Sequence, residues 1–205
     1  MLLEAWESKI EMAAQATILP DGCRDLLFRA IPGKAPQWEI TSLDESAYRI
    51  EMQAGTYFKG FRLHAGASIN TQRLLAAMQG VVPDDTGIED RLQDFSWLDP
   101  LVADTLDALY AQTCPDGTVA NAATSLGVHP RRLQRAMARH TGRSAAKWLA
   151  LARVRKAART IRQGENLAAV ANDCGYADQP HMHRAFKQWL GTTPKFSPAL
   201  SKGYG

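Results

Sequence analysis

One stretch of the sequence decides how the C-terminal half folds: Gly175-Tyr176-Ala177-Asp178-Gln179-Pro180-His181-Met182-His183-Arg184-Ala185-Phe186-Lys187. The short run Val170–Cys174 precedes the glycine, and a segment with helical periodicity follows it. Glycine suits a turn conformation that costs free energy in a residue with a Cβ atom. A short helix, a glycine turn and a second helix are typical of a helix-turn-helix.

The same design occurs earlier in the chain, in Ala122-Ala123-Thr124-Ser125-Leu126-Gly127-Val128 and then Leu133-Gln134-Arg135-Ala136-Met137. Gly127 corresponds to Gly175, Arg135 to Arg184 and Gly142 to Gly191, with an offset that grows by one residue inside the turn. Agreement through both helices favours two helix-turn-helix units over a chance repeat. Residues 145–162, between the two copies, are expected to form one long helix.

The outer faces of the two second helices, expected at about 130–140 and 179–190, carry the candidate DNA-binding side chains. At about 100° per residue, Leu133 and Met137 share an inner face in the first helix, as Met182 and Phe186 do in the second. Arginine can bond guanine bidentately, glutamine can bond adenine, and both suit a helix in the major groove. The candidates are Arg131, Gln134, Arg135, Gln179, Pro180, His183, Arg184 and Lys187.

The charge is divided unevenly along the chain. Residues 1–113 carry 9 Lys and Arg against 17 Asp and Glu, whereas residues 114–205 carry 15 against 4. A basic half joined to an acidic one is expected where only one half meets a polyanion. Nucleic acid is the leading candidate, because clustered cations displace the counterions of its phosphates, and the alternative is a solvated, arginine-rich helical surface.

The second repeat, followed by Gly191-Thr192-Thr193-Pro194, closely resembles the signature of AraC/XylS-type transcriptional regulators. The earlier Gly127 and Leu133-Gln134-Arg135, and the string Arg153-Val154-Arg155-Lys156-Ala157, resemble the same family over about residues 118–196. The resemblance implies two recognition helices in successive major grooves, joined by one long helix whose arginines partly contact phosphates. His129 departs from the family, which usually has a serine cap there.

The N-terminal half is predicted to be α+β. Apolar and β-branched runs bounded by Pro and Gly predict strands at 24–30, 37–43, 46–52 and 56–64, and helical periodicity predicts helices at 69–79 and 99–112. The predicted fold is therefore an α+β domain at 1–113, with a small, mostly antiparallel sheet plus helices. An all-α domain of two helix-turn-helix units joined by a long helix follows at 114–205.

Two segments of this half, 18–28 and 60–67, resemble a little-characterised sensor-type domain found ahead of some AraC-type DNA-binding regions. The resemblance implies a regulatory or dimerising role and names no ligand. Five residues in these segments are candidates to line an effector pocket, with turn chemistry and surface salt bridges as the alternative: Asp21, Cys23, Asp25, Arg62 and His64.

Cys23 lies beside Arg24, and a neighbouring cation lowers a thiol pKa, so a methyl-accepting DNA-repair regulator that uses Cys23 is one alternative. Repair regulators of that class hold the thiol in a four-cysteine zinc site, and this chain has only three cysteines. His181 and His183 cannot chelate one ion, because residues two apart on a helix point about 200° from each other. We expect no metal, no cofactor and no enzymatic activity.

The sequence thus predicts a cytoplasmic, sequence-specific transcriptional regulator with no membrane association, because no apolar run approaches the roughly 20 residues of a membrane span. Its N-terminus also has acids where a secretory signal carries lysines. The expected partners are double-stranded DNA, an unidentified small-molecule effector, a second copy of the chain, and RNA polymerase if the protein activates transcription. An adaptor that does not bind DNA is the remaining alternative.

Overall fold

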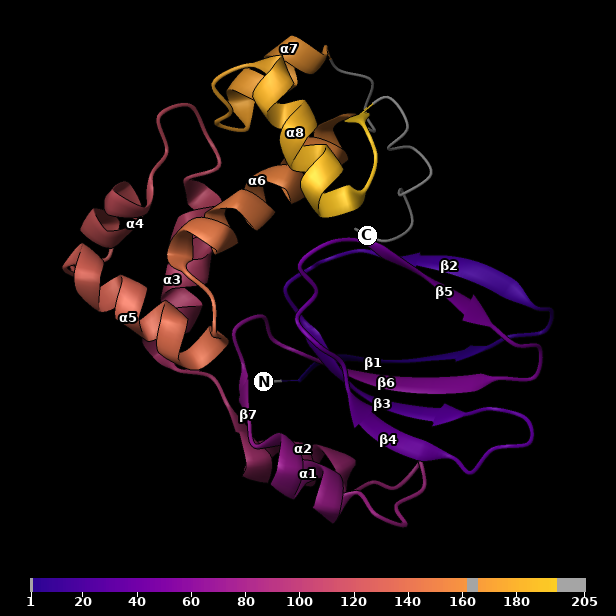
Figure 1. Ribbon diagram of the computed structural model, residues 1–205. Coiled ribbons are helices and arrows are strands. Elements are labelled where there is room, and N and C mark those ends of the chain that lie inside the picture. Colours follow the sequence, from indigo (N-terminus) through magenta and orange to yellow (C-terminus); the bar gives the residue numbers. More distant parts are fainter. Residues whose placement is uncertain (1, 162–165, 195–205) are drawn as a thin grey trace. The chain divides into compact units, whose positions relative to one another are not determined.

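The computed structural model describes residues 2–161 and 166–194, and the chain divides into two compact units (Figure 1). Unit 1 comprises Met1–Ala16, Cys23–Leu43 and Arg49–Asp99. Unit 2 comprises Pro100–Gly205 together with two short segments from the first half of the chain, Thr17–Gly22 and Asp44–Tyr48.

Unit 1 is built on a four-stranded sheet in the order β1-β6-β3-β4. All three neighbouring pairs are antiparallel, as the sequence predicted. The strands are β1 (Leu2–Lys9), β3 (Arg24–Ala30), β4 (Gln37–Ile40) and β6 (Tyr57–Leu63).

One face of this sheet carries the core of unit 1. Leu26 and Phe61 are cross-strand partners on β3 and β6, and both are buried, as is Leu63 at the end of β6. They cluster with buried residues such as Leu74 of α1 (Thr71–Ala77) and Leu92 of α2 (Ile88–Phe95), two helices that lie together beside the sheet in Figure 1. Burial of each such side chain stabilises the fold by about 1.5–3 kcal/mol, which is what ties the helices to the sheet.

Two short sheets complete the strands: β2 (Ala14–Ile18) with β5 (Tyr48–Met52), and β7 (Ser68–Ile69) with β8 (Ser96–Trp97). The sequence patterns did not predict β1, β2, α2 or the two-residue strands β7 and β8. In β1 only every fourth residue is partly buried, so the strict alternation that marks a half-buried strand is absent from its sequence. The strands expected at 37–43 and 46–52 are shorter in the structure: β4 ends at Ile40, and β5 begins at Tyr48.

Unit 2 is helical, in agreement with the predicted all-α region. Its helices are α3 (Pro100–Ala111), α4 (Val119–Ser125), α5 (Pro130–Thr141), α6 (Ala145–Ile161), α7 (Leu167–Asp173) and α8 (Gln179–Leu190). The helices predicted at 99–112, about 130–140, 145–162 and about 179–190 are present, with ends within one residue of the predicted bounds.

The helix α3 groups with unit 2, whereas the sequence analysis placed it in the N-terminal domain. Val102, Thr105 and Leu109 form its buried stripe, and α3 packs against α4, α5 and α6. The charge change after residue 113 suggested the other assignment, because α3 itself carries Asp104 and Asp107 on its exposed side. Charged residues lie on the solvated face of a helix, so they do not indicate which other helices its apolar face packs against.

Candidate nucleic-acid interface

The first helix-turn-helix consists of α4, a turn at Gly127, and α5. Gly127 has φ +64°, the left-handed region that favours glycine. His129 caps α5, because its Nδ1 accepts the backbone N–H of Arg131 at 3.2 Å. Pro130 then begins the helix, at a position where its missing N–H costs nothing. The imidazole therefore does what a serine hydroxyl does at an N-cap.

The two faces of α5 differ in burial as the periodicity predicted. Leu133 and Met137 are fully buried against the rest of unit 2. The opposite face is exposed and carries three of the candidate DNA-binding residues, Arg131, Gln134 and Arg135. Ala138 continues this exposed face and leaves room for another surface to approach closely.

The second helix-turn-helix repeats this construction in α7, a turn at Gly175 with φ +74°, and α8. Asp178 caps α8, because its carboxylate accepts the backbone N–H of His181 at 2.6 Å. Met182 and Phe186 are fully buried beneath the helix.

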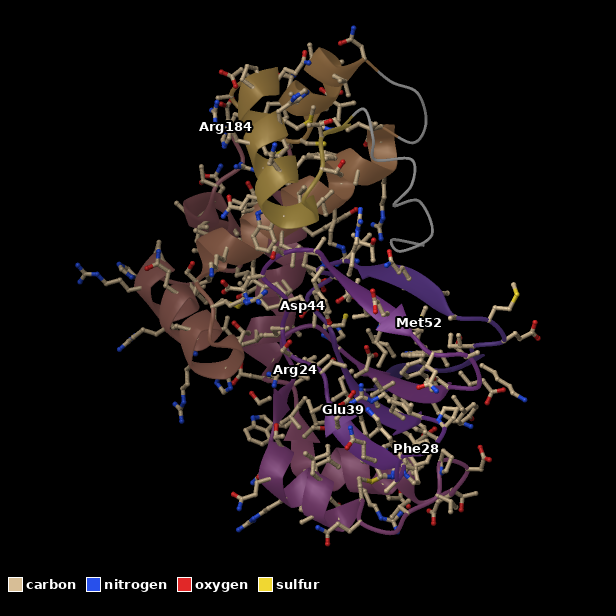
Figure 2. The ribbon with its side chains drawn as sticks, turned by 45° about the vertical axis from the view of Figure 1, so that its right-hand side comes forward. Arg24, Phe28, Glu39, Asp44, Met52 and Arg184 are labelled. Carbon is tan, nitrogen blue, oxygen red and sulfur yellow. The ribbon has the colours of Figure 1, made fainter. Side chains whose placement is uncertain are left out.

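The outer face of α8 presents Pro180, Arg184 and Lys187 to solvent, and Figure 2 shows Arg184 projecting from this helix. Gln179 and His183 are half-buried, with the side-chain nitrogen of Gln179 3.4 Å from Nε2 of His183. These two residues lie one turn apart, so their side chains meet on the same side of α8.

A surface hollow of about 520 Å³ lies along α8. It is lined by His183, Arg184, Lys187, Gln188 and Thr193. Three of the five are candidate DNA-binding residues, and all five offer hydrogen-bonding groups. The surface of the hollow is mainly apolar although cationic side chains line it, so its lining alone does not favour a nucleic acid over an apolar ligand.

The cations of these two faces have no acidic partner within the part of the chain that the structure describes. Among the residues that the structure describes, no ion pair includes Arg131, Arg135, Arg184 or Lys187. Uncompensated positive charge on exposed helices attracts a polyanion and raises its local concentration. The arrangement can therefore hold phosphates electrostatically and present arginine and glutamine to bases.

Three cations of the connecting helix α6 donate to backbone carbonyls within unit 2, a role that the sequence did not indicate. The expectation that its arginines are partly phosphate contacts and partly solvated charge stays a prediction. Nη1 of Arg155 donates to the Asp21 oxygen at 2.7 Å, and Nη2 of Arg153 to the Gly117 oxygen at 2.7 Å. Lys156 donates to the Asp173 oxygen at 2.8 Å. The sequence contained one indication that these cations act together, because Arg153 and Lys156 lie three residues apart and so share one face of α6.

In unit 1 the structure brings together two of the five effector candidates. Asp25 and Arg62 are cross-strand partners on β3 and β6, with Nε of Arg62 3.2 Å from Oδ1 of Asp25. The Asp25 side chain is 12% exposed, and Trp6 Nε1 lies 3.5 Å from the same oxygen. Glu4 accepts from the other side of the Arg62 guanidinium at 3.4 Å. Asp25 and Arg62 are thus engaged with each other and with β1.

The other three effector candidates have separate environments. His64 follows β6, and its Nδ1 lies 2.7 Å from the oxygen of Ala65. Cys23 is half-buried at the start of β3. Asp21 belongs to unit 2, where its carbonyl accepts from Arg155.

Over residues 2–161 and 166–194, no group of three or more His, Cys, Asp and Glu side chains could hold a metal ion. Within the same ranges, no helix has the length and apolar character that a membrane crossing requires.

Comparison with known proteins identifies the C-terminal region. A family model described as a helix-turn-helix domain matches residues 122–196. A curated protein of Streptomyces lividans, described provisionally as an AraC-like transcription regulator, is 32% identical over 97 residues. The match covers 47% of this chain and 32% of that protein, so the chain spans about a third of the relative's length.

Two solved structures show a partial likeness to this chain. The C-terminal domain of AraT, a response regulator from Geobacillus stearothermophilus, is 25% identical, covers 50% of this chain and 86% of its own, and has a TM-score of 0.46. ToxT from Vibrio cholerae is 9% identical, covers 97% of both chains, and has a TM-score of 0.48. At these TM-scores the overlays add nothing to the assignment, which depends on the family model, the curated relative and the paired helix-turn-helix units themselves.

Proposed function

We propose that the chain is a sequence-specific, AraC-type DNA-binding transcriptional regulator that reads two successive major grooves, one with α5 and one with α8. The helix-turn-helix family model over residues 122–196 and the AraC-like relative support the proposal. One observation carries the proposal. The two helices expose equivalent arginines, Arg135 and Arg184, on faces opposite their buried residues and without acidic partners among the described residues.

The proposed roles follow from side-chain chemistry. Arg135 and Arg184 bond guanine O6 and N7, and Gln134 and Gln179 bond adenine or hold a phosphate. Arg131 and Lys187 contact the backbone, which fixes the register of each helix. Pro180 allows close approach at the start of α8, and His183 contacts a base edge or a phosphate beside Arg184.

The N-terminal half is proposed to regulate the DNA-binding half or to pair two copies of the chain. Functionally we divide the chain into a regulatory part at 1–113 and a DNA-binding part at 114–205, with α3 as a support on which the DNA-binding helices pack. Homodimerisation, a small-molecule effector and contact with RNA polymerase remain predictions, as does the absence of catalysis. Any effector site that uses Asp25 or Arg62 must compete with the ion pair they form.

Selection of binding sites from a random duplex library tests base reading directly. Arg135→Ala is expected to weaken binding and relax preference at one base pair, because a bidentate arginine discriminates by about 1–3 kcal/mol. Arg184→Ala is expected to do the same about one helical turn away. If both variants bind more weakly but select the same sequences as the wild type, the two arginines hold phosphates and the readout belongs to their neighbours.

The matched control is Arg139→Ala, an exposed arginine in the last turn of α5. If Arg139 meets a phosphate, its loss should weaken all sequences about equally and reduce the salt dependence of log K by about 0.9. It should leave the selected sequence unchanged. The linker arginine Arg155 is unsuited to this control, because its guanidinium donates to Asp21.

Two other results would replace the proposal. A folded full-length chain that enriches no sequence and does not bind duplex DNA would indicate an adaptor. Transfer of a methyl group from methylated DNA to Cys23, measured by mass spectrometry, would indicate a repair function.

A further inference from the structure

The two helix-turn-helix units are alike in sequence but differ in packing at their turn glycines. A Cβ atom added to Gly127 would meet nothing within 4 Å. A Cβ atom added to Gly175 would lie 2.5 Å from the Cys114 carbonyl oxygen and 3.0 Å from Nε of Arg153. The turn of the second unit is therefore in close contact with the segment between α3 and α4, and with α6.

Lys156 of α6 joins these segments directly. Its ammonium donates to the carbonyl oxygen of Thr113, just beyond α3, and to that of Asp173, the last residue of α7, at 2.8 Å. Carbonyls at helix C-termini have no partner within the helix and lie at the negative end of its dipole. One ammonium thus satisfies carbonyls at the ends of two helices that are distant in sequence.

Arg153 lies one turn earlier on the same face of α6. Its Nη2 donates to the carbonyl oxygen of Gly117 at 2.7 Å, and Gly117 directly precedes Thr118, the N-cap of α4. We call Arg153, Lys156 and the three carbonyls of Thr113, Gly117 and Asp173 the α6 clamp. It ties the start of the first helix-turn-helix to the middle of the second.

The other end of α6 is tied to the first recognition helix. Nε1 of Trp148 donates to Oγ1 of Thr141, the last residue of α5, at 2.9 Å in a buried contact. Trp148 and Lys156 are eight residues apart, about 12 Å along a helix. Figure 1 shows α6 running from α3 towards α8, and it packs against α3, α5, α7 and α8. A single rigid helix therefore carries the attachments of both units.

We propose that Arg153 and Lys156 are positioning residues that set the spacing of α5 and α8, and with it the spacing of the two base blocks that the protein reads. The inference rests on the proposed DNA-binding function and concerns residues that need not touch DNA. Base blocks read by two recognition helices lie about one helical turn apart, and a shift of one unit along α6 would change that distance. Without the α6 clamp, α7 and α8 remain attached to α6 by apolar packing, which is less directional than hydrogen bonds.

Binding-site selection from a random duplex library, with the full-length protein, tests the proposal. Lys156→Met removes both hydrogen bonds while it keeps the stem and the helix propensity of the position. The wild type is expected to enrich two base blocks at one spacing, and Lys156→Met the same blocks at several spacings. On the wild type's own enriched duplex, one inserted base pair should cost the wild type about 10- to 100-fold in affinity, the loss of one bidentate arginine contact. The same insertion should lower the affinity of Lys156→Met by less than about threefold, because a loosened unit can follow the shifted block.

The two turn glycines provide a matched pair of variants. Gly127→Ala and Gly175→Ala carry the same strain of a positive φ, but only the second creates a clash, with the Cys114 carbonyl and with Arg153 of the α6 clamp. Gly127→Ala is expected to keep a single spacing and Gly175→Ala to lose it. Lys156→Arg, which retains donors at this position, should restore the single spacing. Far-ultraviolet circular dichroism establishes that each variant is folded, and Lys156→Met decides the question alone if Gly175→Ala does not fold.

The outcomes separate the two proposals. If folded Lys156→Met binds more weakly but keeps the single spacing and the full cost of the inserted base pair, the α6 clamp stabilises the domain only and the inference is wrong. If the wild type itself enriches no sequence, the proposed function fails, and the spacing role fails with it.

Discussion

At the scale of single residues, Gly60 is explained by a close approach that leaves no room for a Cβ atom. Gly60 lies opposite Trp6 across the β1–β6 pair, and an added Cβ atom would be 2.2 Å from Cε2 of the indole. The backbone of Gly60 needs no positive φ, so the glycine serves packing alone. Trp6 covers Gly60 and reaches Asp25, which links this contact to the Asp25–Arg62 pair.

Gly60→Ala is therefore expected to lower the free energy of unfolding of unit 1 by about 1–3 kcal/mol, through displacement of the indole. Trp6→Ala alone is also expected to destabilise unit 1, because packing is lost. The double variant should cost less than the sum of the two, by about 0.5–3 kcal/mol of coupling, because alanine at 60 fits once the indole is gone. Urea unfolding followed by circular dichroism measures all four proteins. Additive effects would mean that the two side chains do not interact.

Tyr176 predicts a dependence on pH. Its hydroxyl has no hydrogen-bond partner among the described residues, and burial raises the pKa of this group above its usual value near 10. Below about pH 10 the hydroxyl is protonated in the folded and the unfolded state alike. Above that pH the unfolded state loses the proton first, so stability falls by up to about 1.4 kcal/mol per pH unit. Tyr176→Phe should remove this part of the alkaline loss and be close to neutral at pH 7.

Urea unfolding at intervals from about pH 8 to pH 11 tests this on the wild type and Tyr176→Phe. Tyr110→Phe is the control, since Tyr110 is 49% exposed. A stability difference between Tyr176→Phe and the wild type that stays constant across the range would contradict the burial argument.

At the scale of elements, α5 and α8 depend on caps that the sequence supplies next to them. Asp178 accepts from His181 at the start of α8, and His129 accepts from Arg131 at the start of α5. The αL glycines Gly142 and Gly191 end the two helices. Both ends of each helix are therefore specified locally, which explains why their bounds were predictable.

Asp178→Ala is expected to destabilise unit 2 by about 1 kcal/mol, the usual cost of a lost N-cap. Asp178→Asn should cost only a few tenths of a kcal/mol, because the amide oxygen can still accept the N–H of His181. Asp104→Ala, an exposed aspartate within α3, controls for loss of charge and is expected to stay within about 0.5 kcal/mol of the wild type. Thermal unfolding measures the three. Equal effects of Asp178→Ala and Asp178→Asn would show that the charge of the carboxylate, and not the cap, is what matters.

At the scale of the whole molecule, the boundary of the helical unit does not follow the boundary of charge. α3 belongs to unit 2 through Val102, Thr105 and Leu109, although it lies in the acidic half of the chain. Two further segments of that half, Thr17–Gly22 and Asp44–Tyr48, also belong to unit 2. The helical unit is therefore larger than the basic region.

A fragment of residues 100–205 is accordingly expected to be more stable than one of residues 114–205. Loss of α3 exposes apolar surface on α4, α5 and α6, and each Val or Leu withdrawn costs about 1.5–3 kcal/mol of burial. Circular dichroism melts compare the two fragments, and the one that begins at 100 should have the higher Tm by several degrees. Equal Tm values would mean that α3 contributes nothing to the helical core, in conflict with its buried stripe.

The sequence by itself determined the helical half almost completely. Its periodicity, glycine turns and caps are local, and the repeat places Arg135 and Arg184 at equivalent positions whatever surrounds them. Local patterns did not predict β1, because this strand is defined by its pairing with β6 and its sequence lacks a regular alternation of buried and exposed residues.

Only the tertiary structure decided the partners of the linker cations and of the strand residues. Arg153, Arg155 and Lys156 look alike in sequence as helix-surface cations, yet each donates to a carbonyl far away in the chain. Gly60 likewise becomes necessary only once Trp6 lies across from it. The physical reason is the range of the interactions: helix ends and faces are set by residues within about four positions, whereas these contacts form between segments that only the folded chain brings together.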